Sequence, residues 1–173
     1  MDDVTLLADD GTAIGTLAKS EVHTRDTPLH LAFSCYVRDE HGRLLLTRRA
    51  LTKRTWPGVW TNSFCGHPRP GEDMTDAVRR HGRHELGIGL SGIRLVLPDF
   101  RYRAIDASGI VENEICPVHV ARVDGELSAD PDEVAEWAWI EPDDLLGAVA
   151  RAPFAFSPWM RDQLPQLRLL GEV

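Results

Sequence analysis

Two glutamates, Glu112 and Glu114, are separated by one residue in an otherwise apolar segment. Side chains alternate between the faces of a strand, so both carboxylates are expected on one face, together with Ile110, Cys116 and Val118. Burying two unpaired carboxylates side by side is costly, and their repulsion raises the pKa of one of them. A bound cation would remove both costs, and a face exposed to solvent would remove them equally well.

Three histidines, His23, His30 and His67, could complete a metal site with these glutamates. His23 and His30 stand on either side of Pro28, a spacing that suits a bend turning both imidazoles inward. A single histidine is more often a packed or exposed residue than a metal ligand. Taken together, three imidazoles and two carboxylates are too many for a closed tetrahedral zinc site and favour a six-coordinate Mn²⁺ or Mg²⁺-like centre.

The segment from Gly66 to Ile88 reads G-x5-E-x7-R-H-G-R-H-E-L-G-I. It resembles the Nudix box, G-x5-E-x7-R-E-U-x-E-E-x-G-U, where U is an apolar residue. The residues that match in register are Gly66, Glu72, Arg80, Glu85, Gly87 and Ile88. Where Nudix hydrolases carry two further glutamates, this chain has His81 and His84. The resemblance implies that the loop–helix scaffold is kept and that the multi-metal site that activates water is lost.

The segments around this box are similar to those of type I isopentenyl diphosphate isomerases, over residues 47–53, 56–63, 65–68, 99–104, 109–114 and 156–160. The resemblance extends from about residue 11 to residue 159, nearly the whole chain. It implies an enzyme of isoprenoid biosynthesis that interconverts isopentenyl and dimethylallyl diphosphate by moving a double bond through a tertiary carbocation. It also implies an α/β (α+β) fold, with a Nudix-like mixed sheet sandwiched by helices.

The resemblance assigns the metal ligands residue by residue. It forms one site, for Mn²⁺ or another divalent ion, from His23, His30, His67, Glu112 and Glu114. Glu85 would help to hold a Mg²⁺ ion bound to the diphosphate, with the backbone carbonyl of Cys65 as a further ligand.

The same resemblance matches Lys19, Arg49 and Lys53 to contacts with the diphosphate. Lys19 and Lys53 are the only lysines among 19 Lys and Arg residues. A compact ammonium group can approach phosphate oxygens in a crowded cluster where a guanidinium fork does not fit. Chance placement of the two lysines is the alternative.

Four residues are assigned to catalysis: Cys65, Glu114, Tyr102 and Trp159. Cys65 and Glu114 would be the acid–base pair on opposite faces of the substrate. We expect Glu114, hydrogen-bonded to Tyr102, to protonate C4, and Cys65, a thiolate stabilised by nearby cations, to take the C2 proton. These roles can be exchanged, because the reaction is reversible. Trp159 would shield the carbocation through a cation–π contact, and its alternative role is a core residue under the last helix.

The elements that position these residues can be read from the apolar pattern. Strands are expected at 14–18, 31–38, 44–47, 93–97, 100–104, 110–123 and 136–140. Residues 52–73 are rich in Gly and Pro and predict a long structured loop. Asp73 and Gly87 predict the two ends of a helix over 74–86, and shorter helices are expected over 142–149 and 158–164.

The length predicts a single domain of residues 1–173, with a core of about 29–145. Residues 1–28 are expected to form an N-terminal segment that carries metal ligands, and residues 146–173 a C-terminal helical segment. With 27 acidic against 19 basic residues, a net charge of −8 argues against binding to nucleic acid or to an anionic membrane. The expected partner is a small-molecule substrate, and a monomer is expected rather than an oligomer.

The chain begins Met-Asp-Asp-Val, without a basic segment followed by an apolar one, so no secretory signal is predicted. Three cysteines without a CxxC spacing indicate reduced thiols and a cytoplasmic protein. Cys35 and Cys116 are expected to be buried packing residues, and Trp137 and Trp139 core residues. Two alternatives stay open: a Nudix-type diphosphate hydrolase, and a non-catalytic Nudix-like module that binds a metal or a ligand.

Overall fold

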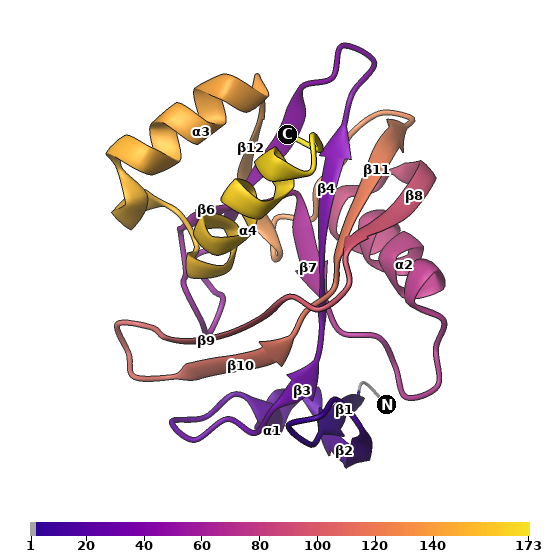
Figure 1. The fold of residues 1–173 in the computed structure, drawn as a ribbon, viewed down its shortest axis with the longest axis vertical. Helices are drawn as coiled ribbons and strands as arrows, with labels where there is room; N and C mark the ends of the chain where they lie inside the picture. The colour runs from indigo at the N-terminus through magenta and orange to yellow at the C-terminus, as the bar shows by residue number, and fades with distance from the viewer. Residues whose placement is uncertain (1–2) are drawn as a thin grey trace.

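The computed structural model describes residues 3–173, which form two β-sheets flanked by helices (Figure 1). The helices are α1 (Lys19–Val22), α2 (Met74–Leu86), α3 (Pro142–Arg151), η1 (Pro153–Ala155, a 3-10 helix) and α4 (Pro158–Leu169). The strands are β1 (Asp3–Leu7), β2 (Ala13–Ala18), β3 (His30–Leu31), β4 (Phe33–Arg38), β5 (Leu44–Arg49), β6 (Trp60–Thr61), β7 (Phe64–Gly66), β8 (Gly89–Leu97), β9 (Arg101–Ile105), β10 (Val111–Ile115), β11 (Val118–Asp124) and β12 (Val134–Ile140).

The larger sheet has the strand order β12-β5-β4-β11-β8, with β6 paired to β5 and β7 paired to β4. It is mixed, because β4 and β11 run parallel while its other neighbours run antiparallel. Side chains of β4 alternate between two apolar clusters. Phe33, Cys35 and Val37 pack with residues of α2, whereas Tyr36 packs with residues of α3 and α4. A mixed sheet between helices, as expected from the sequence, is therefore confirmed.

The smaller sheet has the strand order β2-β1-β3-β10-β9 and lies at the end of the larger sheet where β3 leads into β4 (Figure 1). Residues 1–28 contribute two of its five strands, β1 and β2, and β3 follows directly after them. β3 runs parallel to β10, and this pairing brings residues near position 30 beside the glutamates near position 114. The segment expected to carry metal ligands is thus built into the sheet that holds the two carboxylates.

The strand expected over 110–123 is wrong in one respect, because the structure divides it into β10 and β11. The two strands belong to different sheets, and the chain passes between the sheets at Cys116 and Pro117. Proline has no backbone N–H to donate to a ladder, so strand pairing ends there. Glu112 and Glu114 share a strand, but Cys116 and Val118 do not continue their row.

Helix α2 has the bounds that the sequence predicts. The Asp73 side chain accepts hydrogen bonds from the backbone N–H groups of Thr75 and Asp76, and Gly87 has a φ of 67°, which favours glycine. Helix α4 continues beyond its expected end, through Pro165 to Leu169, since Leu164 and Leu167 bury its inner face.

Two smaller expectations concern single side chains. Cys35 and Cys116 are buried, as expected. Trp137 is not a core residue, since it is 45% exposed on β12. Among the described residues, none of the helices reaches the length and hydropathy that crossing a membrane requires.

Candidate active site

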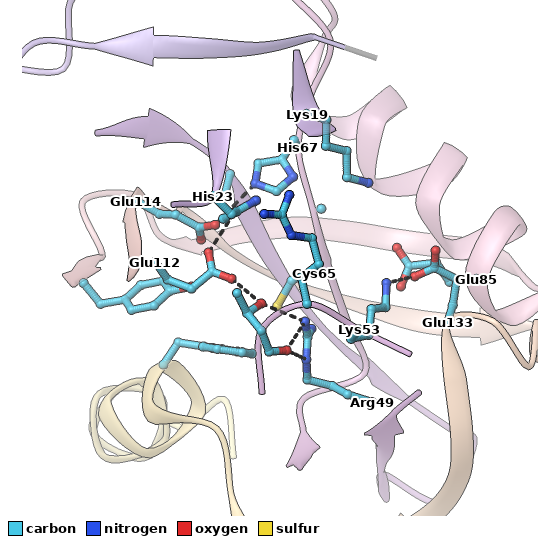
Figure 2. A pocket seen from close by; sticks show the side chains of 16 residues that line it. Lys19, His23, Arg49, Lys53, Cys65, His67, Glu85, Glu112, Glu114 and Glu133 are labelled. Atoms are coloured by element: carbon cyan, nitrogen blue, oxygen red, sulfur yellow. Dashed lines mark hydrogen bonds and ion pairs between the residues drawn. The ribbon is translucent and has the colours of Figure 1, made fainter. Parts of the chain in front are cut away.

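A cavity of about 210 Å³ opens between the two sheets and the N-terminal end of α4 (Figure 2). Its lining includes every candidate residue named from the sequence except His30, which is fully buried behind it: Lys19, His23, Arg49, Lys53, Cys65, His67, Glu85, Tyr102, Glu112, Glu114 and Trp159. These residues come from segments as distant as α1 and α4. The structure thus brings the candidate metal, diphosphate and acid–base residues together.

Strand register explains the surroundings of Glu114. Strand β10 lies between β3 and β9, so Glu114 has His30 beside it on one strand and Tyr102 on the other. Glu112, two residues earlier on β10, points to the same side. Both carboxylates are buried, at 6% exposure for Glu112 and 4% for Glu114.

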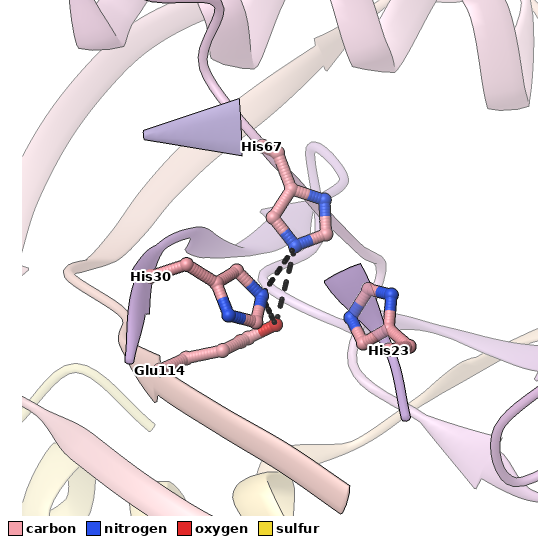
Figure 3. A group of neighbouring side chains, drawn as sticks. All are labelled: His23, His30, His67 and Glu114. Atoms are coloured by element: carbon pink, nitrogen blue, oxygen red, sulfur yellow. Dashed lines mark hydrogen bonds and ion pairs between the residues drawn. The ribbon is translucent and has the colours of Figure 1, made fainter. Parts of the chain in front are cut away.

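His23, His30, His67 and Glu114 form a compact group of possible metal ligands (Figure 3). One ligand atom from each residue lies within 4.8 Å of all the others. Glu114 Oε1 is 3.4 Å from His30 Nε2 and 3.3 Å from His67 Nε2, and these two nitrogens are 3.2 Å apart. Nitrogens and oxygens that converge from separate elements are the donors that a divalent ion takes.

The hydrogen bonds at this group also fit a metal ion. His30 Nδ1 lies 2.9 Å from the carbonyl oxygen of Pro28, and a proton on Nδ1 leaves Nε2 with its lone pair turned toward the cluster. His23 Nε2 and Glu112 Oε2 are both buried and lie 3.0 Å apart. Neither atom forms a hydrogen bond within residues 3–173, with the other or with any further group. Buried polar atoms without partners are costly, and a shared cation would satisfy both.

Glu112 holds a more peripheral position than expected, since it lies outside the group of four. Its Oε1 accepts a hydrogen bond of 2.7 Å from the hydroxyl of Thr55. Only Oε2 is left to face His23, so Glu112 extends the group at one edge.

The pKa values of Glu114, His67 and His30 are shifted in different directions by their surroundings. Burial opposes ionisation of Glu114, but hydrogen bonds with His30 and His67 outweigh it and hold the pKa of Glu114 well below its usual range. Burial lowers the pKa of His67 to about 4. Burial acts in the same direction on His30, but the neighbouring Glu114 carboxylate outweighs it and raises the pKa of His30. Glu114 is thus a carboxylate, and His67 is a neutral imidazole able to bind a metal.

The environment of Cys65 disfavours the thiolate that was expected there. Burial raises the pKa of Cys65 to about 12, although hydrogen bonds with Ser34 and Asn62 act to lower it. The Cys65 Sγ atom lies 3.3 Å from both Ser34 Oγ and Asn62 Oδ1. The charge of Glu114 raises this pKa further, and Arg49 is the nearby cation that opposes it. Burial therefore favours the thiol form of Cys65 in the metal-free protein.

Trp159 is nearly fully buried, at 2% exposure, and its ring forms part of the cavity wall. Its Nε1 donates a hydrogen bond of 3.0 Å to Asn62 Oδ1, the same oxygen that faces Cys65. Trp56 and Tyr102 pack against the indole, with ring centroids 5.5 and 5.6 Å from it. Asn62 thus fixes the indole and the sulfur relative to each other.

Tyr102 stands directly across from Glu114, but the expected hydrogen bond between them is absent from the described part of the chain. Burial raises the pKa of Tyr102 well above the usual range, and the negative charges of Glu114 and Glu112 raise it further. Tyr102 therefore stays protonated and can donate its hydroxyl proton in a hydrogen bond.

Figure 2 shows the expected diphosphate contacts on the other side of the cavity from Glu112 and Glu114. Lys53 forms an ion pair with Glu133, a cavity residue that sequence reasoning missed. Figure 2 shows Glu133 and Glu85 close together around the Lys53 ammonium group. The Arg49 guanidinium donates two hydrogen bonds to the backbone carbonyl of Thr55, at 3.0 and 2.9 Å, and Lys19 is exposed to solvent. This side is rich in charge and open to an anion.

The Nudix-box residues hold the loop that carries His67. Arg80 donates to both carboxylate oxygens of Glu72, at 2.8 and 2.7 Å, and to the backbone carbonyl of His67 at 3.2 Å. The hydrogen bond from Arg80 is the largest influence on Glu72 and outweighs burial, so the pKa of Glu72 falls to about 2. The box therefore supports a candidate ligand here, in addition to supplying Glu85.

Glu133 and Thr55 have no signal in the sequence that would identify them. Glu133 is 80 residues from its partner Lys53, in a loop where acidic residues are common. That loop is fixed by hydrogen bonds from Asp130 N to the carbonyl of Glu85, and from Ala50 N to the carbonyl of Glu133. Only the three-dimensional fold reveals the pair.

Comparisons with known proteins identify the family. Residues 28–167 match the family model of the NUDIX domain. The chain is 61% identical over 164 residues to the isopentenyl-diphosphate Delta-isomerase of Clavibacter michiganensis subsp. michiganensis (strain NCPPB 382), covering 95% of this chain and 84% of that protein. It is also 61% identical to the protein of that name from Paenarthrobacter aurescens (strain TC1), covering 95% and 89%.

Solved structures are similar in fold. The crystal structure of DR0079 from Deinococcus radiodurans has a TM-score of 0.73 at 20% identity, over 95% of this chain and 98% of that one. A MutT NUDIX hydrolase from Burkholderia pseudomallei has a TM-score of 0.62 at 27% identity, over 80% and 98%. By its sequence identity to the isomerases and its fold, the chain belongs to the isopentenyl-diphosphate Delta-isomerase family of NUDIX-domain proteins.

Proposed function

We propose that this chain interconverts isopentenyl and dimethylallyl diphosphate, with Cys65 and Glu114 as its acid–base pair. The observation that carries the proposal is their position in one cavity, where Cys65 lines the wall beside Asn62 and Glu114 belongs to the histidine cluster. A NUDIX domain with that cluster and a cysteine in the same cavity fits proton transfer to and from carbon better than hydrolysis.

The reaction needs one proton added to the substrate and another removed from its opposite face. We assign proton transfer at C4 to Glu114, which lies across from Tyr102, and transfer at C2 to Cys65. In the metal-free protein the pKa shifts favour a thiol at Cys65 and a carboxylate at Glu114. That state can accept the C4 proton and donate at C2, which is the direction from dimethylallyl to isopentenyl diphosphate. Moving one proton between the pair prepares the site for the opposite direction.

A tertiary carbocation must be kept away from water and stabilised. The Trp159 indole presents a buried aromatic face to the cavity, held by Asn62 and packed by Trp56 and Tyr102. A desolvated cation–π contact contributes about 2 kcal/mol. We therefore assign to Trp159 the stabilisation of the cationic carbon.

We propose that a divalent ion binds to His23, His30, His67 and Glu114, with Glu112 as a fifth ligand, and that Mn²⁺ and Mg²⁺ suit this donor set. Such an ion, when bound, lowers the proton affinity of the Glu114 carboxyl group and so makes it a stronger acid. Glu85, with Lys19, Arg49 and Lys53, is assigned to a second cation and the diphosphate that it accompanies. Lys53 and Arg49 orient the diphosphate, so that the isoprenyl chain enters between Cys65 and Glu114.

The hydrolase alternative is weaker. The box lacks two of its glutamates, and His81 takes part in packing rather than facing solvent. The three cysteines are free thiols, which suits the reducing cytoplasm that we propose as the place of action, and the small-molecule diphosphate is the proposed partner.

Proton NMR of isopentenyl diphosphate with the protein in D₂O tests the function. An isomerase places deuterium in a methyl group and at C2 as dimethylallyl diphosphate forms. An unchanged spectrum over hours with Mg²⁺ and Mn²⁺ present would refute the proposal, and release of inorganic phosphate would favour the hydrolase instead.

A further inference from the structure

His81 replaces a box glutamate and lies between two residues assigned to separate metal ions. Its Nδ1 is 2.8 Å from Glu85 Oε1, the carboxylate assigned to the diphosphate-bound cation. Its Nε2 is 3.3 Å from the backbone carbonyl of His67, whose side chain belongs to the histidine cluster. One imidazole thus contacts both halves of the site.

The ring of His81 has almost no freedom to move. It is 5% exposed, and a Cβ atom placed on Gly66 would lie 2.6 Å from three of its ring atoms. Phe33 packs edge-on against it, with centroids 5.3 Å apart. Gly66, the first residue of the box, is therefore needed here to leave room for His81.

The contact with Glu85 has a definite direction. A carboxylate can only accept, so Nδ1 donates to Oε1, and this leaves Oε2 for another partner. Glu85 is four residues after His81 on α2, so the helix itself sets their spacing. Since the imidazole is held by Gly66 and Phe33, it fixes the rotamer of Glu85.

We propose that His81 is a positioning residue that fixes Glu85 for the diphosphate-bound cation and links it to the loop of His67. This inference rests on the proposed function, because that function assigns a cation to Glu85. Groups that hold a metal-binding carboxylate from behind typically contribute 10- to 100-fold to metal affinity. His81 itself is not among the described residues that line the cavity.

Two variants separate positioning from packing. His81→Leu keeps an apolar side chain in the buried space but removes the donor, whereas His81→Gln keeps an N–H that can reach the carboxylate. His84→Ala is the matched control, because His84 is an exposed histidine on the same helix. Thermal melts establish that each variant is folded.

The first readout is the binding of Mn²⁺ in the presence of inorganic pyrophosphate, measured by electron paramagnetic resonance. We expect His81→Leu to lower the affinity for the Mn²⁺ that binds only with pyrophosphate by about tenfold. The affinity for the Mn²⁺ that binds without pyrophosphate should be unchanged. His81→Gln should stay within about threefold of the parent, and His84→Ala should match it. The second readout is isomerisation: His81→Leu should need about tenfold more Mg²⁺, and saturating Mg²⁺ should restore most of kcat.

Parental Mn²⁺ binding in folded His81→Leu would overturn the inference, as would equal losses in the Leu and Gln variants, which would indicate packing alone. If His81→Leu does not fold, His81→Gln decides: near-parental binding supports the inference, and a tenfold loss overturns it. If the parent enzyme itself does not isomerise the substrate, the proposed function fails, and the Mn²⁺–pyrophosphate measurement still judges His81.

Discussion

The two halves of the cavity are held by different kinds of contact. Around Glu114 the side chains are largely buried, and their possible ligand atoms converge, as those of His30 and His67 do. Around Lys53 they are half-exposed, and opposite charges already neutralise each other, as in the pair with Glu133. The first half is pre-arranged by the sheet and gains from a cation. On the proposed assignment, the second half exchanges its internal ion pair for the diphosphate.

The largest effect should come from the acid–base pair in the buried half. Cys65→Ser and Glu114→Gln should each lower kcat by about 10³-fold or more, because each removes a group that transfers a proton. Isotope exchange followed by NMR measures the loss, and substrate binding should survive it. A variant that keeps near-parental turnover would remove that residue from the assignment.

The buried half should also show the clearest pH dependence of stability. His67 has a folded-state pKa of about 4, below the usual histidine value of 6.5, so the unfolded chain binds more protons between these values. The free energy of unfolding of the metal-free protein should therefore fall as the pH drops from about 6.5 to 4, by on the order of 3 kcal/mol.

Denaturant melts in a chelator at several pH values measure this dependence. His67→Asn should flatten it over that range, although the raised pKa of His30 acts in the opposite sense. An equally steep dependence in the variant would show that His67 is not its source.

Trp159 should have an intermediate effect. Trp159→Leu keeps an apolar residue but removes the aromatic face, and a loss of about 2 kcal/mol corresponds to roughly 30-fold in kcat. Trp159→Phe should recover part of the rate. Because Asn62 loses its indole partner in both variants, equal rates for Leu and Phe would indicate that positioning of Asn62, rather than the aromatic ring, is what matters.

The charged half should respond more weakly and mainly in KM. Lys53→Met should raise KM about tenfold with a small change in kcat, because it removes a charged contact to the diphosphate. The contact should weaken as salt concentration rises. An unchanged KM in low salt would exclude Lys53 as a diphosphate ligand.

The smallest effect concerns the competing carboxylate. Glu133→Gln should free Lys53 and increase the affinity for inorganic pyrophosphate by about threefold, as expected for a partly exposed ion pair. Calorimetry measures the change. A marked decrease would show that Glu133 helps to hold the cation rather than competing for the ammonium group.

Local features of the structure could be predicted from the sequence, whereas contacts between distant segments could not. Local rules predicted α2 with both ends, because Asp73 and Gly87 act within a few residues. Alternation placed Glu112 and Glu114 on one face. The meeting of His23, His30 and His67 came from the resemblance, since spacing cannot establish that the end of α1, strand β3 and the residue after β7 lie together.

The remaining errors have physical causes beyond the local pattern. The apolar run through Cys116 continues across Pro117, so the sequence pattern does not show that β10 and β11 belong to different sheets. The pKa of Cys65 depends on burial by distant segments, which outweighs the cation beside it. The pair of Lys53 and Glu133 joins residues 80 positions apart. Each of these depends on tertiary packing.

Anomalous diffraction from crystals soaked in Mn²⁺, with and without inorganic pyrophosphate, tests the central claim most directly. We predict one Mn²⁺ among His23, His30, His67 and Glu114 in both crystals, and a second beside Glu85 only when pyrophosphate is present. A histidine cluster that stays empty at saturating Mn²⁺, or a single Mn²⁺ site at Glu85 alone, would contradict the account.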